Sequence, residues 1–402
     1  MEKLVVQKYG GTSVGSIDRI KAVAKKIIDT KKSGYDLVVV VSAMGKTTDE
    51  LLSMAYDLNE KPSNRELDQL LATGEQISIS LLAMALESQG YNAISLTGPQ
   101  CGILTDPIHK KARISNINPQ RLLSELEQDK IVIVAGFQGI NEISDVTTLG
   151  RGGSDTTAVA IAAALQALRC EIYTDVEGVF TADPRKVENA KLIPKISYDE
   201  VLELASLGAQ VLHPRSIELA RRFNVPLMVK SSFKNSNGTE IMEVDTMENV
   251  SVRGVSLDDN IAKISILEVP DKPGIAFRIF SELAKNHVHV DMILQNVNRN
   301  SVNDISFTVS QDDFKDAVKI CQDIGFEIGA QKVIYDQGVA KLSVVGTGIG
   351  GSAEIASKYF ETLYNLGINI QMISTSEIKI SCIIDKALSE EAMKSLHDAM
   401  GL

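Results

Sequence analysis

The chain has 402 residues, 44% of them hydrophobic and 23% charged, a composition typical of a globular protein with about two or three domains. The formal net charge of −11 argues against nucleic acid as a partner. Cys101, Cys170, Cys321 and Cys382 lack CxxC spacing, so neither a disulfide framework nor a zinc ribbon is indicated. The longest apolar run, at about 37–41, is too short to span a bilayer, and no apolar leader precedes the first strand. We therefore expect a cytoplasmic protein without a membrane partner.

Up to about residue 244, apolar runs typical of buried strands alternate with helical runs. The expected strands are 4–9, 36–43, 93–98, 131–137, 170–176 and 226–232. The strongest helical patterns cover 17–34, 75–90 and 154–168. This alternation predicts an α/β domain with a mostly parallel sheet covered by helices on both faces.

Two glycine-rich turns stand between strand-like and helix-like runs in this part. The first is QKYGGTSVG at Gln7–Gly15, and the second is TLGRGGSDTTA at Thr148–Ala158. Glycines and hydroxyl residues at such turns allow backbone N–H groups to approach an anion at a helix N-terminus. Two such turns in one domain predict a phosphoryl-transfer site rather than a single anion pocket.

Charged residues in the two turns suggest their roles. Lys8 is placed where its ammonium can face a transferring phosphate, while Gly10 and Gly11 admit close backbone approach. Arg151 offers a planar fork for a carboxylate. Asp155 can orient a lysine or Mg²⁺, or contact a substrate ammonium; capping of the helix that follows is compatible with these roles.

The C-terminal part contains an internal repeat. Two copies of a strand, loop, helix and strand begin near residues 261 and 339, with an offset of 78 residues between matching Ala-Lys pairs. Each copy continues into another strand and another helix, which predicts two βαββαβ units. We expect a catalytic domain at 1–245, a linker at 246–260, and modules at 261–336 and 337–402.

The motifs together resemble the aspartokinases of the amino-acid-kinase superfamily. They are KYGGTSVG, SAMGKTTDEL, ATGE, AGFQG, TTLGRGGSDTTA, YTDVEGVFTADPR and GAQVLHPRS, followed by two repeats that resemble ACT domains. The resemblance covers essentially the whole chain in the family's motif order. It implies an amino-acid-kinase-like sheet sandwiched by helices, followed by two α+β ACT modules, in the compact form without a fused dehydrogenase.

The resemblance implies transfer of the γ-phosphate of MgATP to the side-chain carboxylate of L-aspartate, giving 4-phospho-L-aspartate. It also implies feedback control by lysine, threonine or both. Two alternatives stay open: another carboxylate kinase of the superfamily, of the glutamate or carbamate type, and a non-catalytic amino-acid sensor. A sensor would be expected to lose Lys8 or Asp155, and the sequence keeps both.

By resemblance, Lys8 and Asp155 are catalytic. The implied ATP-binding residues are Lys8, Gly10, Gly11, Ser42, Ser154, Thr174, Asp175, Val179, Phe180, Asp183, Arg185 and Gln210. Phe180 would form the apolar wall of the adenine and ribose pocket. Gln210 stands where many relatives carry lysine, which leaves its nucleotide contact open. No residue is assigned to a protein-bound metal, and Mg²⁺ is expected with ATP.

The implied aspartate-binding residues are Thr47, Glu75, Arg151, Gly152, Gly153 and Ser154. Glu75 would contact the substrate ammonium, although a glutamate that opens a helix also suits the helix dipole. Thr48 is an adjacent alternative to Thr47.

The predicted effector site lies in the first ACT-like module. Its residues are Asp271, Gly274, Ile275, Ala276, Asp291, Gln295 and Asn296. An acidic side chain would pair with the ammonium of a free amino acid, and backbone N–H groups would bind its carboxylate. The modules are also expected to assemble a homo-oligomer, with a separately translated ACT-only subunit as an open possibility.

Overall fold

The structure is a computed structural model that describes residues 3–206, 212–243, 250–297 and 302–402. The chain divides into two compact units. The first unit contains 1–179, 192–205 and 210–245, and the second contains 180–191, 206–209 and 246–402. Each unit is described by itself below.

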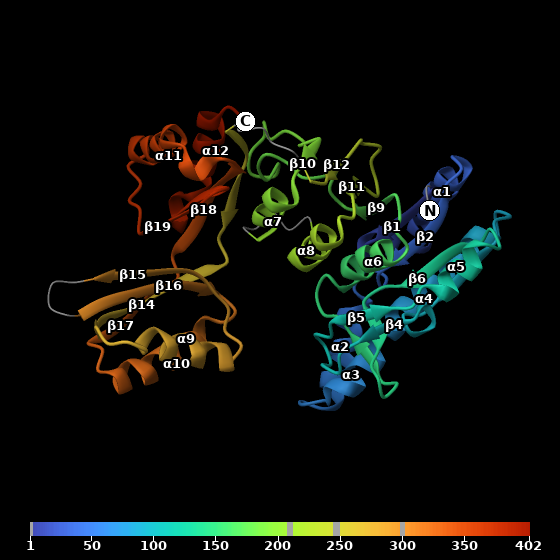
Figure 1. The fold of residues 1–402 in the computed structure, drawn as a ribbon, viewed down its shortest axis with the longest axis horizontal. Helices are drawn as coiled ribbons and strands as arrows, with labels where there is room; N and C mark the ends of the chain where they lie inside the picture. The colour runs from blue at the N-terminus through green and yellow to red at the C-terminus, as the bar shows by residue number, and fades with distance from the viewer. Residues whose placement is uncertain (1–2, 207–211, 244–249, 298–301) are drawn as a thin grey trace. The chain divides into compact units, whose positions relative to one another are not determined.

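The first unit is built on an eight-stranded sheet with the order β10-β12-β11-β9-β1-β2-β6-β3 (Figure 1). In that order the strands are Lys195–Ile196, Thr239–Ile241, Leu227–Ser231, Arg169–Thr174, Leu4–Tyr9, Asp36–Val41, Ile131–Ala135 and Ala93–Leu96. Neighbouring strands are parallel except β11 and β12. The predicted mostly parallel sheet is therefore confirmed.

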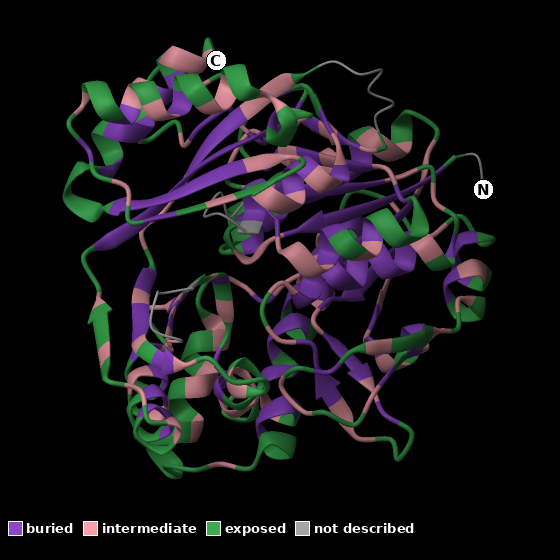
Figure 2. Ribbon diagram, turned by 60° about the vertical axis from the view of Figure 1, so that its left-hand side comes forward, coloured by how far each residue is buried: buried purple, intermediate pink, exposed green. Residues whose placement is uncertain are grey.

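Helices cover both faces of this sheet because its central strands are apolar on both sides. Helices α1 (Ile17–Lys32) and α4 (Thr73–Glu87) bury one face in a core with alternate residues of β1, β2 and β6. Helix α6 (Gly153–Ala164) packs against β1, β2 and β9 and is almost entirely buried. Figure 2 shows that burial concentrates in the strands and in the inward faces of the helices. The remaining helices of this unit are α2 (Thr47–Leu58), α3 (Asn64–Leu71), α5 (Gln120–Leu126), α7 (Tyr198–Ser206) and α8 (Pro214–Phe223).

A small second sheet, in the order β5-β4-β7-β8, lies in the same unit. Its strands are Ile114–Ile117, Ile103–Thr105, Gln138–Ile140 and Val146–Thr148. Strand β8 leads directly into the second glycine turn, so this sheet positions the loop that precedes α6.

One helical stretch of the first unit, Asn64–Glu87, is long and apolar enough to span a membrane by length and composition alone. It comprises α3 and α4, and half of its most apolar window is buried inside the protein. The buried residues of α4, among them Ile79, Leu82 and Leu86, belong to the core of this unit.

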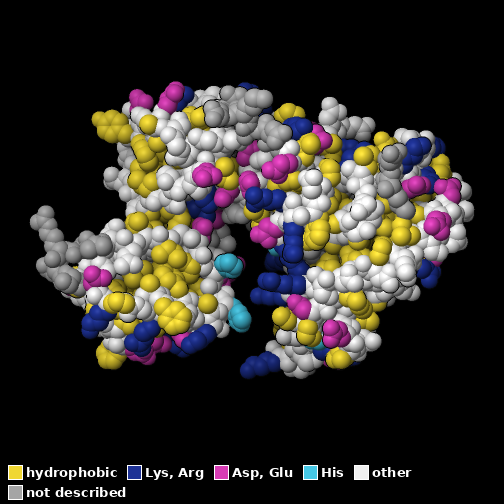
Figure 3. Space-filling model, in the orientation of Figure 1, with side chains coloured by type: hydrophobic (Ala, Val, Ile, Leu, Met, Phe, Trp, Pro, Cys, Tyr) yellow, Lys and Arg dark blue, Asp and Glu magenta, His cyan; other side chains and the backbone are white. Residues whose placement is uncertain are grey.

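The first ACT-like module of the second unit has the predicted βαββαβ order. Its elements are β14 (Ile261–Pro270), α9 (Ile275–Lys285), β15 (Val290–Val297), β16 (Val302–Ser310), α10 (Phe314–Ile328) and β17 (Lys332–Asp336). They form a sheet in the order β15-β16-β14-β17, covered by the two helices over a separate apolar core. Hydrophobic side chains also gather on the visible surface of this module (Figure 3), and Phe277 of α9 is 75% exposed.

The second module takes one strand from outside the predicted repeat. Its sheet has the order β13-β18-β20-β19, formed by Ser251–Asp258, Val339–Thr347, Lys379–Asp385 and Met372–Ser376. Helices α11 (Ala353–Asn365) and α12 (Ser389–Met400) cover it. The predicted linker at 246–260 is thus corrected, since β13 pairs antiparallel with β18 along its whole length. The first module is inserted between β13 and the rest of the second.

Residues 180–191 also belong to this second module, although they lie between two strands of the eight-stranded sheet in sequence. Ala182 and Val187 are buried in its apolar core. The backbone N–H of Val255 donates to the carbonyl of Thr181 at 2.7 Å, and Thr181 Oγ1 bonds to Nε2 of the buried His397 at 2.9 Å. This segment is therefore a structural part of the second unit.

Candidate functional site

Two loops of the first unit meet at the carboxyl ends of its central strands β1 and β2. The backbone N–H of Gly45, in the loop after β2, donates to the carbonyl of Gly11, in the loop after β1, at 3.0 Å. A Cβ at Gly11 would lie only 2.7 Å from the carbonyl oxygen of Ala43. Only glycine at position 11 allows this backbone contact. Ligands of open α/β sheets bind at this edge.

Lys8 and Asp155 form the central ion pair of this edge. Lys8 Nζ lies 2.6 Å from Asp155 Oδ1, and the two side chains are only 11% and 13% exposed. Lys8 is the penultimate residue of β1, and Asp155 lies in the first turn of α6. A Cβ at Gly10 would sit 3.5 Å from the same ammonium. The structure thus joins the two glycine turns through the two residues predicted to be catalytic.

The Arg151 loop is shaped by glycines that adopt positive φ. Gly150 and Gly152 have φ of +76° and +69°, and α6 begins at Gly153. A Cβ at Gly152 would clash with the His213 ring, with contacts of 2.3 Å. Arg151 is exposed, so its guanidinium is available to a ligand, whereas Ser154 is buried below Gly136.

Glu75 presents a buried carboxylate on the first turn of α4. It is 2% exposed, and its Oε1 accepts a hydrogen bond from the backbone N–H of Ala43 at 3.2 Å. Its Oε2 has no partner within the described structure. Burial raises the pKa of this carboxyl to about 8. An unsatisfied, buried acid of this kind suits a site that receives a cation.

The loop after β2 lies beside Glu75. The Thr47 hydroxyl donates to the carbonyl of Met44 at 2.7 Å, and Thr47 is the first residue of α2. A Cβ at Gly74 would contact Thr47 Cγ2 at 3.5 Å. Thr47 therefore lies against the ATGE turn, and Thr48 follows it on the same helix. Ser42 is held by a bond from its N–H to the carbonyl of Tyr9 at 3.1 Å.

The predicted nucleotide residues divide between the two units. Thr174 is the last residue of β9 and Asp175 follows it, next to the point where Gly10 N–H donates to the carbonyl of Tyr173 at 3.3 Å. Val179 is buried in the first unit, and its N–H bonds to Thr239 Oγ1 at 2.9 Å. The members of the set in the second unit are Phe180, Asp183 and Arg185. Gln210 lies outside the described residues.

Asp183 and Arg185 are bonded to each other. The guanidinium of Arg185 donates to Asp183 at 3.0 and 2.8 Å, which lowers the pKa of the Asp183 carboxyl. Arg185 is 87% exposed along its side chain.

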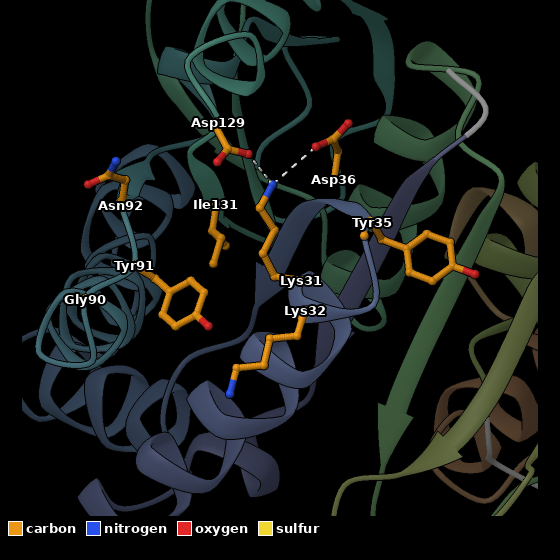
Figure 4. Close-up of a pocket in the computed structure, with 10 residues that line it drawn as sticks. Lys31, Lys32, Tyr35, Asp36, Gly90, Tyr91, Asn92, Asp129 and Ile131 are labelled. Carbon is orange, nitrogen blue, oxygen red and sulfur yellow. Dashed lines mark hydrogen bonds and ion pairs between the residues drawn. The ribbon is translucent and has the colours of Figure 1, made fainter.

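The opposite edge of the sheet carries a hollow of about 520 Å³ near the start of β2 and β6. Figure 4 shows the Lys31 ammonium between Asp36 and Asp129, at 3.2 and 2.7 Å. Both carboxylates are thus engaged with a lysine of the same unit. None of the predicted site residues lies here, which favours the carboxyl edge as the functional one.

The predicted effector residues do not gather at one point within the chain. Asp271 accepts a bond from Asn303 Nδ2 at 3.0 Å near the start of α9, whose N-cap is Gly274 with a φ of +94°. Asp291 instead pairs with the Lys341 ammonium of the second module. Strand register places Asn296 beside Asp304, at the Asp271 end of the sheet. Asp291 is five residues back along β15, about 16 Å at 3.3 Å per residue.

Asn303 is a polar residue of this region that the sequence did not single out. It is 3% exposed, and its Oδ1 has no partner in the described part of the chain. Ile275 and Ala276 follow Gly274 as the first residues of α9, and Gln295 is exposed on β15. The predicted residues that the structure brings together are thus those of the Asp271–Gly274 loop, with Asn303 beside them.

No cluster of three His, Cys, Asp or Glu side chains able to hold a metal ion occurs among the described residues. Asp155, in the first turn of α6, forms an ion pair with Lys8. Mg²⁺ is commonly held by one or two carboxylates together with substrate phosphates. A single aspartate here is compatible with a metal that arrives with the nucleotide.

The fold and the site define a kinase of the amino-acid-kinase type with ACT modules. The model of the amino acid kinase family matches residues 3–231, and that of the ACT domain matches 267–323 and 342–400. An aspartokinase of Bacillus sp. strain MGA3 is 49% identical over 400 residues, covering 99% of this chain and 97% of the relative. The chain belongs to the aspartokinases of the amino acid kinase family, as its motifs predicted.

Solved structures agree with this assignment. Aspartokinase III of E. coli in complex with lysine and aspartate, in the T-state, has a TM-score of 0.77 at 25% identity, covering 99% of both chains. The same enzyme in complex with aspartate and ADP, in the R-state, has a TM-score of 0.82 at 24% identity, covering 99% of this chain and 100% of the other. At 24% identity, the similarity to this second structure supports the fold alone.

Proposed function

We propose that this chain transfers the γ-phosphate of MgATP to the side-chain carboxylate of L-aspartate, giving 4-phospho-L-aspartate and ADP. This reaction opens the biosynthesis of lysine, threonine and methionine. The observation that carries the proposal is the buried Lys8–Asp155 pair between two glycine loops, with Glu75 at the start of α4 and Arg151 in the loop before α6 of the same unit. The names of full-length relatives support it.

The chemistry requires positioning and charge control rather than a strong base. The aspartate side chain, with an ordinary pKa of about 3.9, is already an anion at neutral pH. One of its oxygens forms a bond to the γ-phosphorus while the bond to the β,γ-bridging oxygen breaks, and ADP leaves. Lys8 would offset the charge of the transferring group, and Asp155 holds its ammonium in place. Mg²⁺ would enter with ATP as part of that substrate.

The two charged groups of the aspartate backbone need separate partners. The Glu75 carboxylate would accept the ammonium, and the guanidinium of Arg151 would grip the α-carboxylate in a bidentate pair. Gly152 is the N-cap of α6, and Gly153 and Ser154 are its first two residues. They would offer backbone or hydroxyl donors beside Arg151. Thr47, or Thr48 beside it, would complete the pocket.

A hydroxylamine-trapping assay tests this function. With MgATP, we expect the full-length protein to form a hydroxamate from L-aspartate and to leave L-glutamate and carbamate largely unphosphorylated. A preference for glutamate or carbamate would assign the chain to another carboxylate kinase. Absence of turnover with all three, combined with amino-acid binding, would favour a sensor.

Replacement of Arg151 by alanine should raise the KM for aspartate by roughly 10–100-fold, since a charged hydrogen-bonded pair contributes about 1.5–3 kcal/mol. The KM for MgATP should change less than about twofold. Steady-state kinetics with each substrate varied in turn measures both constants. Arg121→Ala is a suitable control, because Arg121 pairs with Glu125 on α5. A loss of ATP affinity with aspartate affinity preserved would reverse the assignment.

The adenine and ribose contacts are proposed from the family resemblance. Thr174 ends β9, and Asp175 and Val179 follow it in the first unit; the Gly10 loop contacts this strand end through the carbonyl of Tyr173. Phe180, Asp183, Arg185 and Gln210 complete the proposed set. The proposal would fail if alanine at Asp175 and at Asp183 both left the KM for MgATP unchanged.

Feedback control is proposed to act through the ACT modules, by lysine, threonine or the two together. The complex of E. coli aspartokinase III contains lysine, which supports an amino-acid effector here. We place the effector ammonium near Asp271 and the unpaired Asn303 Oδ1, with backbone N–H groups of Gly274 and Ile275 for its carboxylate. Asp291, Gln295 and Asn296 lie on β15, an edge strand of its sheet. A partner module at that edge would bring these residues to the site.

Asp271→Ala should weaken inhibition by the effector at least tenfold while kcat without effector changes less than twofold, because Asp271 belongs to the second unit and the proposed catalytic residues to the first. Inhibition curves on the full-length enzyme give both values. Lys272→Ala, at the next position, is the control and should retain inhibition. Unaltered inhibition of the Asp271 variant would remove this carboxylate from the effector site.

We also propose a cytoplasmic homo-oligomer assembled through the ACT modules, with or without an ACT-only subunit. An exposed apolar residue on one edge strand of each module supports this assembly, namely Ile293 on β15 and Ile373 on β19, which are 55% and 45% exposed. Analytical ultracentrifugation of the full-length chain tests it. A monomer at micromolar concentration would contradict it.

A further inference from the structure

We propose that Asp68 is a positioning residue that holds the Glu75 segment and the Arg151 loop at a fixed separation. The proposal rests on the aspartate-binding roles given to Glu75 and Arg151 above. Asp68 contacts neither substrate in this scheme. It acts through Thr148 and through the turn at His109–Lys110.

Asp68 lies on α3 and has no exposed surface. Its Oδ1 accepts a hydrogen bond from Thr148 Oγ1 at 2.5 Å, and its Oδ2 bonds to His109 Nδ1 at 2.7 Å. The backbone N–H of Lys110 donates to both oxygens, at 3.1 and 3.0 Å. One carboxylate thus ties together a helix, a turn and strand β8.

A fully buried carboxylate is costly unless its oxygens are satisfied. The bonds to Asp68 come from residues 41 to 80 positions away in sequence, so they are purely tertiary. The Thr148 hydroxyl and the His109 imidazole both form hydrogen bonds with the Asp68 carboxylate. The network therefore fixes distant segments rather than a local turn.

Each end of the network lies a few residues from a proposed substrate contact. Asp68 precedes Glu75 by seven residues, and the two are joined through the turn between α3 and α4. Gln138 Nε2 donates to the carbonyl of Ala72 in that turn at 2.8 Å. Thr148 precedes Arg151 by three residues. Movement of Asp68 would thus be transmitted to both contacts.

The Arg151 loop is clamped on its other side by Arg215. The guanidinium donates to the carbonyls of Leu149 and Ala112 at 2.9 and 2.8 Å. The N–H of Ala112 donates to the carbonyl of Thr148 at 3.0 Å, and a Cβ at Gly150 would lie 2.9 Å from the carbonyl oxygen of Lys110. The turn that bonds Asp68 is therefore also the surface against which the Arg151 loop rests.

This arrangement matters because the ammonium and α-carboxylate of aspartate are attached to the same carbon atom. Their two partners must keep a separation defined to within about half an ångström for both to bind at full strength. Glu75 and Arg151 come from different segments, and the Asp68 network connects those segments. Loosening it should weaken aspartate binding without altering the nucleotide site.

Thr148→Val tests the link, since it removes one hydroxyl and keeps the side-chain shape. We expect the KM for aspartate to rise about tenfold, with the KM for MgATP and the kcat changed less than about twofold. Thr148→Ser keeps the hydroxyl and should restore the aspartate KM to within about twofold. Asp68→Asn should shift the aspartate KM in the same direction, with thermal unfolding recorded to show that each variant is folded.

Thr147→Val provides the matched control. Thr147 is the neighbouring residue on β8, is equally buried, and its hydroxyl bonds to Thr105 Oγ1 at 2.6 Å. A purely structural role for these threonines predicts that both valine variants lose stability and leave the aspartate KM unchanged. That result, or an equal rise in both substrate constants for Thr148→Val, would overturn the proposal. The wild-type hydroxamate assay with aspartate is run first, so failure of the proposed function is recognised separately.

Discussion

Lys8→Ala is expected to reduce kcat by about 10²–10³-fold, because a preorganised group facing developing charge contributes roughly 3–4 kcal/mol to the transition state. The loss should appear in kcat more than in either KM, since the ammonium acts on charge that develops during transfer. Single-turnover measurement of hydroxamate formation isolates this step. The fold should survive, because Lys8 lies at the end of a central strand whose apolar residues are unchanged.

Lys130→Ala is the control for loss of a lysine in an ion pair of the same unit. Lys130 pairs with Glu125 at 2.7 Å, just before β6, and is remote from the motif loops at the carboxyl edge. It should keep wild-type turnover. Near-normal kcat in Lys8→Ala would exclude the charge-neutralising role.

Glu75→Gln is expected to raise the aspartate KM by roughly 10–100-fold, the cost of losing a charged partner for the ammonium. The pH dependence gives a sharper test. Since the Glu75 pKa is about 8 in the folded protein, the carboxylate that binds the ammonium becomes more abundant as pH rises. The wild-type aspartate KM should therefore fall about tenfold between pH 6 and 7, then level off above pH 8. The glutamine variant should lack this slope.

The same residue affects stability. Its folded pKa of about 8 exceeds the ordinary value of 4.5, so the folded state binds more protons between these values and loses stability as pH rises through this window. At pH 7 the cost is roughly 3 kcal/mol relative to acid conditions. Glu75→Gln should remove this loss, so its unfolding midpoint should exceed that of the wild type at pH 7–8. An identical pH dependence of unfolding in both proteins would contradict the buried, protonated state.

The catalytic edge of the sheet could be predicted because its signals are local. Glycines at Gly10 and Gly11 follow an apolar run directly, and the Arg151 loop precedes a helix rich in alanine. Parallel strands bring their carboxyl ends to one edge, so the Lys8–Asp155 contact follows from the α/β pattern. The structure confirms this sheet, and the substrate roles of these residues remain predictions.

The Asp68 network could not be predicted in the same way. An aspartate within a helical sequence pattern predicts a solvent-exposed position. No residue near Asp68 in the sequence predicts otherwise. Its partners His109 and Thr148 lie 41 and 80 residues away. Strand β13 was missed for a similar reason, since its partner β18 begins 88 residues after β13 does. In both cases the deciding interactions are non-local.

Inclusion of residues 180–191 in the second module means that no single cut in the sequence separates catalysis from regulation. A fragment that ends at 245 would carry Ala182 and Val187 without the apolar core that buries them. A subunit begun at Met242 or Met247 would keep His397 but lack Thr181, its hydrogen-bond partner. It would also leave the N–H of Val255 without the carbonyl it now meets. A regulatory chain made without residues 180–191 would thus expose the surface of the second module that this segment covers. The same segment of a longer copy of the protein would fit that surface.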